Sequence, residues 1–301
     1  MNKLFKVLIF LFALWLVSTL VAVFVFDNDV SSVSGKIVVI PINGMITLNG
    51  GGSLLSESVS GQAIVDKINT AIEDDSVKGI VLEINSPGGT VLGSKIVADK
   101  VKSVDKPVVA VITEQGTSGA YWIASQADAI VVDDLSIVGS IGVLGSYLDF
   151  SGLLNDYNIT YQRLVAGDYK DISSPYKEMT IEEEEFVQER LDAIHEYFIK
   201  DVASGRKMSY EDVADLSEGL FYLGFEAKDL GLVDYVGDRE YAINLTKSLA
   251  GLKDGQISEY KDEEGFLQSI FGDYVAYSSF HIGQGIGSVL VSNSNEWKIS
   301  L

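Results

Sequence analysis

One serine in this sequence stands in a setting that suits a nucleophile. Ser118 lies between Gly116 and Gly119, after a run of apolar β-formers at Pro107–Ile112 and before a segment with helical spacing, Gly119–Ala127. Glycines permit a tight turn, and the start of a helix directs free backbone N–H groups towards the serine oxygen. The same G-x-S-G pattern also occurs where a serine merely caps a helix, so the motif alone leaves both interpretations open.

A second motif, Asn85–Gly89 (NSPGG), follows the apolar run Val77–Ile84. Ligand sites of open α/β sheets lie outside the carboxyl ends of parallel strands. Two successive glycines let backbone N–H groups turn towards a reacting carbonyl, as an oxyanion hole requires. By itself a plain Pro-Gly turn is the favoured interpretation. Beside Ser118, the motif predicts the second half of an oxyanion hole, with the N–H group of Gly119 as the other donor.

A serine nucleophile needs a base, and the composition limits the choice. The chain contains no Cys and two His, His195 and His281. His195 falls in a charged helical pattern, where an exposed position is expected, and His281 lies in a Gly/Ser-rich stretch, so we do not expect a Ser-His-Asp triad. A neutral lysine amine can act instead. Lys170 follows the last predicted core strand, although the residues alone favour an ordinary solvated lysine there.

The surrounding elements alternate between strand and helix at a spacing of about 25–35 residues, which is typical of βαβ units on a mainly parallel sheet. The predicted fold class is therefore α/β. A long helix with a Glu-rich start and further helices close the compact part. The expected strands are Lys36–Ile42, Val77–Ile84, Pro107–Ile112, Ala129–Val132 and Thr160–Leu164, and the expected helices are Gly61–Asp74, Val91–Val104, Gly119–Ala127, Ser151–Asn158, Thr180–Ser204, Tyr210–Val236 and Arg239–Leu249.

The N-terminal segment Leu4–Phe26 is almost unbroken in its apolar character. It is long enough to cross a hydrocarbon core of ~30 Å. Lys3 and Lys6 lie at its N-terminal side and acidic residues follow it, which predicts a cytoplasmic N-terminus and an extracytoplasmic body. We expect one uncleaved transmembrane helix within residues 1–28. A cleaved signal peptide, with small residues at Ser31–Ser34, is the alternative.

The remaining organisation follows from composition. Residues 29–60 are expected to hold a linker and the first strand, residues 36–250 the catalytic domain, and residues 251–301 a C-terminal extension. The formal net charge of −21 argues against nucleic acid and against anionic membrane surfaces as electrostatic partners. The absence of Cys and of any ligand-spaced cluster predicts no metal site.

Five segments, in this order, resemble the signal peptide peptidase A family, peptidase family S49, in its short single-copy form. The resemblance covers roughly residues 36 to 250. Thr117 and Ala120 depart from the Ala and Gly that the family often carries at these positions. The segments are Ser86–Gly89, Gly116–Tyr121, Val138–Val143, Tyr169–Pro175 with Glu178–Thr180, and Gly224–Asp234.

The resemblance implies a Clp-protease/crotonase-type ββα-spiral fold and a serine endopeptidase without cofactor. It implies hydrophobic peptide substrates, such as residual signal peptides. It also implies a ring-like homo-oligomer, in which neighbouring subunits help to build the substrate groove. The implied roles are nucleophile for Ser118, general base for Lys170, orientation of the lysine amine for Ser140 and oxyanion binding for Gly89, with Gly88 and Thr117 as possible groove residues.

Three alternatives belong to other classes or to another substrate. A crotonase-type acyl-CoA enzyme shares the fold and the paired-glycine hole, but it needs a basic pocket that this acidic chain gives little sign of. A non-catalytic membrane scaffold is disfavoured because both Ser118 and Lys170 are present. A stomatin-processing membrane peptidase is expected to carry further C-terminal spans, which we do not find.

Overall fold

The computed structural model describes residues 12, 14–15, 35–51 and 58–260. The predicted anchor, residues 1–28, lies outside this part except for Phe12, Leu14 and Trp15, and the predicted C-terminal extension lies outside it from residue 261 onward. Among the described residues, no helix is both long and apolar enough to span a bilayer. Membrane insertion therefore stays a prediction.

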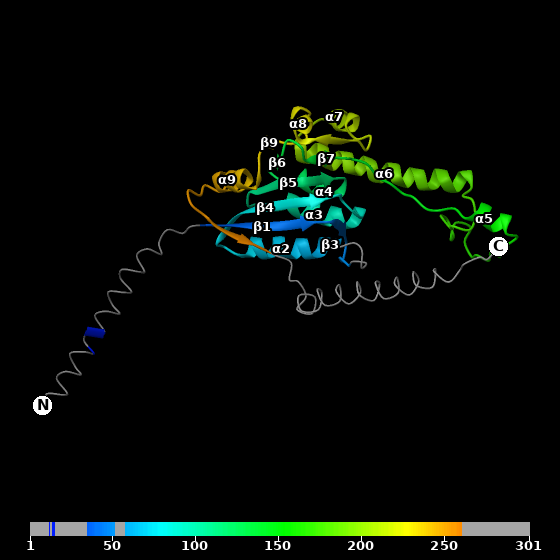
Figure 1. The fold of residues 1–301 in the computed structure, drawn as a ribbon, viewed down its shortest axis with the longest axis horizontal. Helices are drawn as coiled ribbons and strands as arrows, with labels where there is room; N and C mark the ends of the chain where they lie inside the picture. The colour runs from blue at the N-terminus through cyan, green and yellow to red at the C-terminus, as the bar shows by residue number, and fades with distance from the viewer. Residues whose placement is uncertain (1–11, 13, 16–34, 52–57, 261–301) are drawn as a thin grey trace, which may run out of the picture. The chain divides into compact units, whose positions relative to one another are not determined.

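The centre of the protein is a mainly parallel sheet, shown in Figure 1. Its main path runs in the order β10-β1-β4-β5-β6-β9, and every pair along it is parallel. β7 pairs in parallel with the end of β5, β8 pairs antiparallel with β7, and β2 and β3 form a separate parallel pair. The strands are β1 (Lys36–Asn43), β2 (Met45–Thr47), β3 (Ser58–Ser60), β4 (Val77–Ser86), β5 (Val108–Thr117), β6 (Ala129–Val132), β7 (Ile137–Gly139), β8 (Phe221–Leu223), β9 (Tyr235–Val236) and β10 (Gln256–Glu259).

Helices cover both faces of the sheet, because successive strand residues point to opposite sides. Leu82 packs into a core with side chains of α2, α3, α4 and α6, whereas its neighbour Val81 packs into a second core beneath α9. This arrangement confirms the predicted mixed α/β class. The helices are α2 (Gly61–Glu73), α3 (Val91–Lys102), α4 (Gly119–Ala124), α5 (Ser151–Asp156), α6 (Ile181–Arg206), α7 (Tyr210–Asp215), α8 (Gly224–Asp229) and α9 (Arg239–Leu249).

The register of the sheet places the two glycine motifs side by side. Ile84 pairs with Ile112, and after an irregularity Ser86 pairs with Gly116. The carboxyl ends of β4 and β5 therefore lie at the same edge, and each chain segment turns there into a helix. This edge holds the candidate site.

Residues 143–180, which we call the arm, connect β7 to α6. Figure 1 shows α5, within the arm, beside the N-terminal end of α6 and away from the sheet. Lys177 donates to Glu183 at 2.6 Å, and the rings of Tyr169 and Phe186 stack with centroids 6.1 Å apart. The arm is thus attached to the first turns of α6.

The predicted strand Thr160–Leu164 is wrong. These residues lie in the arm, exposed and without a ladder partner. Tyr161 instead packs against Tyr176, and Arg163 donates to Asp171. The side chains of this segment are thus used in contacts within the arm.

The predicted all-helical stretch Tyr210–Val236 is also corrected. It contains α7 and α8, but β8 extends the β7 edge and β9 extends the β6 edge. Arg206 at the end of α6 bonds to Asp234 just before β9, with nitrogen–oxygen distances of 2.7 and 2.8 Å. The first residues of the predicted extension form β10, which adds to the free side of β1.

Candidate active site

Ser118 occupies a strained turn between β5 and α4. Its backbone has φ 52° and ψ −125°, a region that residues with a side chain rarely adopt and that costs about 1–3 kcal/mol. The surrounding structure holds the turn, because the Ser118 N–H donates to the Gly139 carbonyl at 2.8 Å and the Trp122 N–H donates to the Ser118 carbonyl at 3.0 Å. The side chain is half-buried. A strained strand-to-helix turn that leaves a serine accessible suits a nucleophile.

The glycines of the two motifs converge on this turn. A β-carbon added to Gly88, which has φ +94°, would lie 2.7 Å from the Gly119 nitrogen and 2.9 Å from the Ser118 β-carbon. A β-carbon on Gly119 would lie 3.5 Å from the Gly89 nitrogen. Within residues 35–51 and 58–260, the N–H groups of Gly89 and Gly119 donate to no turn, loop or cap acceptor. The predicted oxyanion donors are therefore next to Ser118.

Ser118 and Ser140 line one cavity of about 470 Å³ with a mixed polar and apolar lining. Ser140 has φ 50°, and its hydroxyl donates to the Gly219 carbonyl at 3.2 Å. Thr117, predicted as a possible groove residue, is instead buried, and its hydroxyl accepts from the Gln115 amide at 3.0 Å. The cavity is lined by Ser118, Ser140, Gly142, Val143, Leu144, Gln188, Leu191, Asp192, His195, Ser217, Glu218 and Gly219.

Lys170 is not among the residues that line this cavity. It is exposed in the arm, and its backbone N–H donates to the Gly167 carbonyl at 3.0 Å. The arm there is held by Arg163, whose hydrogen bonds keep the pKa of Asp171 below its usual range. Tyr169, next to Lys170, stacks on Phe186 of α6. Phe186 precedes the cavity residue His195 by nine residues, which is about 13 Å along the helix. Within one chain, the structure does not bring Lys170 to Ser118.

His195 is a cavity residue that the sequence interpretation missed. Its Nε2 is buried and has no hydrogen-bond partner, and its side chain lines the cavity together with Ser118. The expectation of an exposed helix face is therefore wrong for this residue. A signal was present, because Gln188, Leu191, Asp192 and His195 fall at i, i+3, i+4 and i+7, the spacing of one helix face.

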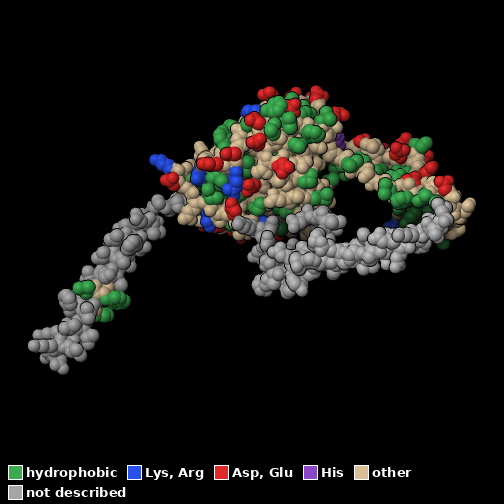
Figure 2. Space-filling model, in the orientation of Figure 1, with side chains coloured by type: hydrophobic (Ala, Val, Ile, Leu, Met, Phe, Trp, Pro, Cys, Tyr) green, Lys and Arg blue, Asp and Glu red, His purple; other side chains and the backbone are tan. Residues whose placement is uncertain are grey.

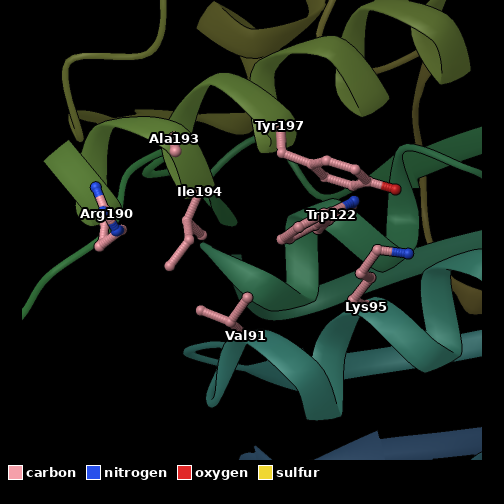
Figure 3. A pocket seen from close by; sticks show the side chains of 7 residues that line it. All are labelled: Val91, Lys95, Trp122, Arg190, Ala193, Ile194 and Tyr197. Carbon is pink, nitrogen blue, oxygen red and sulfur yellow. The ribbon is translucent and has the colours of Figure 1, made fainter.

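A second cavity, of about 370 Å³, opens beside the same two motifs (Figure 3). Val91 follows Gly89 by two residues, and Trp122 follows Ser118 by four. The Trp122 ring is fixed, because it stacks on Phe198 at 4.5 Å and its Nε1 donates to Asp201 at 3.0 Å. Figure 3 shows Arg190 and Lys95 at opposite ends of the cavity. It is lined by Val91, Lys95, Trp122, Arg190, Ala193, Ile194 and Tyr197.

Acidic side chains are spread over the visible face of the molecule in Figure 2 and do not gather into one patch. This distribution fits a generally solvated acidic surface with a net charge of −21.

The fold is a mixed α/β fold with a mainly parallel sheet, and its candidate site places a strained serine turn against paired glycines. The sequence matches peptidase family S49 over residues 100–253. It is 38% identical over 243 residues to a putative protease of Methanocaldococcus jannaschii, which covers 80% of this chain and 77% of the relative. The chain belongs to peptidase family S49.

Two further relatives carry peptidase names. A putative signal peptide peptidase SppA of Enterococcus faecium is 35% identical over 246 residues, which are 80% of this chain and 72% of the relative. Protease 4 of Salmonella typhi is 31% identical over 239 residues, which are 78% of this chain and 38% of that longer protein. The family and these relatives support a protease function of the serine type.

Proposed function

We propose that this protein is a membrane-anchored serine endopeptidase that cleaves hydrophobic peptides, with Ser118 as the nucleophile. The observation that carries the proposal is the convergence of Gly89 and Gly119 on the strained, half-buried Ser118. Such an arrangement offers two backbone donors to a carbonyl oxygen at the point where a serine can attack.

In this mechanism, Ser118 Oγ attacks the scissile carbonyl carbon while a base takes the hydroxyl proton. The negative charge that develops on the carbonyl oxygen is stabilised by the N–H groups of Gly89 and Gly119. The base then gives its proton to the leaving amine and activates water, which hydrolyses the acyl-enzyme.

The base of the proposed dyad is Lys170, with Ser140 orienting its amine. Since Lys170 is in the arm and does not line the cavity of Ser118, the dyad needs the arm to move or a second copy of the chain to supply the lysine. The second route agrees with the proposed homo-oligomer. The homo-oligomer is supported by the surface of the arm, because its large exposed apolar side chains could be covered by a second copy of the chain. These side chains are Leu144, Leu148, Leu153, Tyr157, Ile159 and Leu164.

The proposed substrates are peptides with apolar side chains near the cut, and residual signal peptides are the proposed physiological class. The apolar cavity beside Val91 and Trp122 supports this, because it adjoins both the oxyanion segment and the nucleophile helix. The name of the Enterococcus faecium relative supports the signal-peptide part. An anchor at Leu4–Phe26, with a cytoplasmic N-terminus, would keep the catalytic domain at residues 36–250 close to the extracytoplasmic surface of the membrane.

His195 offers a second candidate for the base. It lines the cavity with Ser118, and its Nε2 is buried and unpaired. An imidazole in this position is a common proton acceptor for serine. If Lys170 is the base, a variant at Lys170 should be inactive, and if His195 is the base, a variant at His195 should be inactive. One peptide-cleavage assay therefore distinguishes the two.

The test is hydrolysis of a fluorogenic apolar peptide by the full-length protein in detergent, beside Ser118→Ala and Lys170→Ala. Lys253→Ala, at an exposed lysine in the turn before β10, is the matched control. We expect the parent and the control to cleave, and both dyad variants to lose at least about a thousandfold in kcat while staying folded. Activity that survives Ser118→Ala rejects the nucleophile, and a parent that is inert on all peptides favours the scaffold.

A further inference from the structure

Ser94 has a buried hydroxyl that makes no hydrogen bond. The residue lies in α3 with an exposed fraction of 0%, and its Oγ has no partner. Two other buried serines are paired, since Ser125 donates to the Trp122 carbonyl at 2.7 Å and Ser217 donates to the Val213 carbonyl at 2.6 Å. An unpaired buried hydroxyl costs stability, so its presence calls for an explanation.

The position of this hydroxyl supplies one. A β-carbon on Gly119 would lie 2.1 Å from Ser94 Oγ, so the hydroxyl stands directly against Gly119. The Gly89 nitrogen lies 3.5 Å from the same point. Gly88, Gly119 and Ala120 around it are buried, whereas Gly89 is exposed. The unpaired hydroxyl therefore packs against Gly119, the residue that carries one of the two proposed oxyanion donors.

We propose that Ser94 is a positioning residue of the oxyanion hole, whose O–H dipole turns towards the negative charge that develops between Gly89 and Gly119. This inference rests on the proposed function, with Ser118 as the nucleophile. A hydroxyl that already had an acceptor would keep its dipole fixed on that acceptor, whereas the Ser94 hydroxyl rotates freely about its Cβ–Oγ bond. In a buried setting such a dipole stabilises a nearby charge more strongly than it would in water.

Because Ser94 is fully buried, it acts on the substrate oxygen through space and through the placement of Gly119, without touching the substrate. A role of this kind affects the transition state and leaves substrate binding unchanged, so it should appear in kcat and not in KM. A role in packing alone would appear in stability instead. The two roles are therefore separable by measurement.

The experiment compares the full-length parent in detergent with Ser94→Ala, Ser94→Cys and Ser125→Ala, using kcat, KM and the midpoint of thermal unfolding. Cys restores the volume of the side chain but is a weak donor. We expect Ser94→Ala and Ser94→Cys to lower kcat about tenfold at unchanged KM. Ser94→Ala should unfold at the parental temperature or above it, because it removes an unpaired polar group. Ser125→Ala should unfold at a lower temperature with parental kcat.

A second measurement, the rate at which an aryl phosphonate reacts with Ser118, tests the oxyanion hole without substrate turnover. An aryl phosphonate that reacts with Ser118 places its P=O oxygen in the oxyanion hole, so both Ser94 variants should react about tenfold more slowly than the parent. The proposal is overturned if Ser94→Ala keeps kcat within about twofold of the parent, or if Ser94→Cys restores it. Ser118→Ala is run beside them. If that variant stays active, the proposed function fails on its own account, whatever Ser94 does.

Discussion

Gly88 packs against Ser118 so closely that a β-carbon on the glycine would lie 2.9 Å from the β-carbon of the serine. The same β-carbon would lie 2.8 Å from the Thr117 carbonyl oxygen. Two segments that are separate in sequence are thus locked together at the end of the sheet. Residue 88 is therefore restricted to glycine twice, by its own φ of +94° and by the space that the turn at Ser118 leaves for it.

Gly88→Ala should abolish peptide cleavage, with a fall in kcat of at least about a hundredfold, because the new methyl group pushes the nucleophile turn away from Gly89. It should also destabilise the fold, since φ is +94°. Gly251→Ala is the matched control, because Gly251 has φ +68° but no heavy atom within 4 Å of the new β-carbon. Both variants should show the backbone penalty in thermal unfolding, and only Gly88→Ala should lose kcat. Parental kcat in Gly88→Ala would contradict the close coupling.

The separation of Lys170 from the cavity of Ser118 leads to a mixing experiment. Ser118→Ala and Lys170→Ala are each expected to be inactive. If a second copy supplies the lysine, oligomers reassembled from both variants contain sites with an intact serine and an intact lysine, and about a quarter of the parental activity should return when sites combine at random. Activity that never returns on mixing, in oligomers shown to have exchanged subunits, points to movement of the arm within one chain.

Much of the fold was predictable, because buried strands and amphipathic helices leave clear patterns. The helix Arg239–Leu249 was predicted at the observed bounds, and Asp238 caps it through a hydrogen bond from the Tyr241 amide. Buried parallel strands such as β6, with the sequence AIVV, read as continuous apolar runs. The short strands β8 and β9 were missed, since they are strands only because a sheet edge is available to them.

The candidate site, like the fold, could be predicted only in part from the sequence. Local turn chemistry pointed to Ser118 and to the segment Asn85–Gly89 but left a plain turn open at both places, and the structure shows that the two turns lie against each other. The helix face that holds His195 could be read from the spacing of its residues, but its place in the cavity of Ser118 could not, since that depends on which element packs against this face of α6. The unpaired hydroxyl of Ser94 was equally invisible, because whether a buried serine has a partner is decided by three-dimensional packing.

His195 provides a test of which group is the base. His195→Gln keeps a hydrogen-bonding side chain of similar reach but cannot accept a proton near neutral pH. If Lys170 is the base, we expect the variant to keep kcat within about tenfold of the parent, with the change mainly in KM because the side chain lines the cavity. A fall in kcat as large as that of Ser118→Ala, with Lys170→Ala still active, would transfer the role to the imidazole.

The apolar cavity gives a prediction about substrate choice. Ile194→Gln places an amide in the lining of the cavity. The KM for peptides with an apolar side chain should rise about tenfold, because burial of a polar group without a partner disfavours binding. Leu249→Gln, at an exposed leucine of α9, is the control and should match the parent. Equal KM values for both variants, across peptides of different side-chain size, would remove this cavity from the binding site.

The pair formed by Arg206 and Asp234 links the end of α6, the helix that lines both cavities, to the β9 edge. Burial by itself would raise the pKa of Asp234, but the hydrogen bonds and charge of Arg206 and the Ile130 amide outweigh it and hold this pKa below its usual range. The carboxylate therefore stabilises the fold fully above the unfolded-state pKa of about 4, and this contribution is lost as the pH falls through the lower native value.

Asp234→Asn should reduce the free energy of unfolding by about 2 kcal/mol near neutral pH, because it leaves the Arg206 guanidinium, which is 6% exposed, without its anion. The deficit should shrink as the pH falls below about 4, where the parental carboxylate becomes protonated as well. Urea unfolding of the parent, Asp234→Asn and the exposed-site control Asp254→Asn, measured from neutral to acid pH, checks both the size and the sign. A constant difference between the parent and Asp234→Asn across this range would show that the pair contributes no pH-dependent stability.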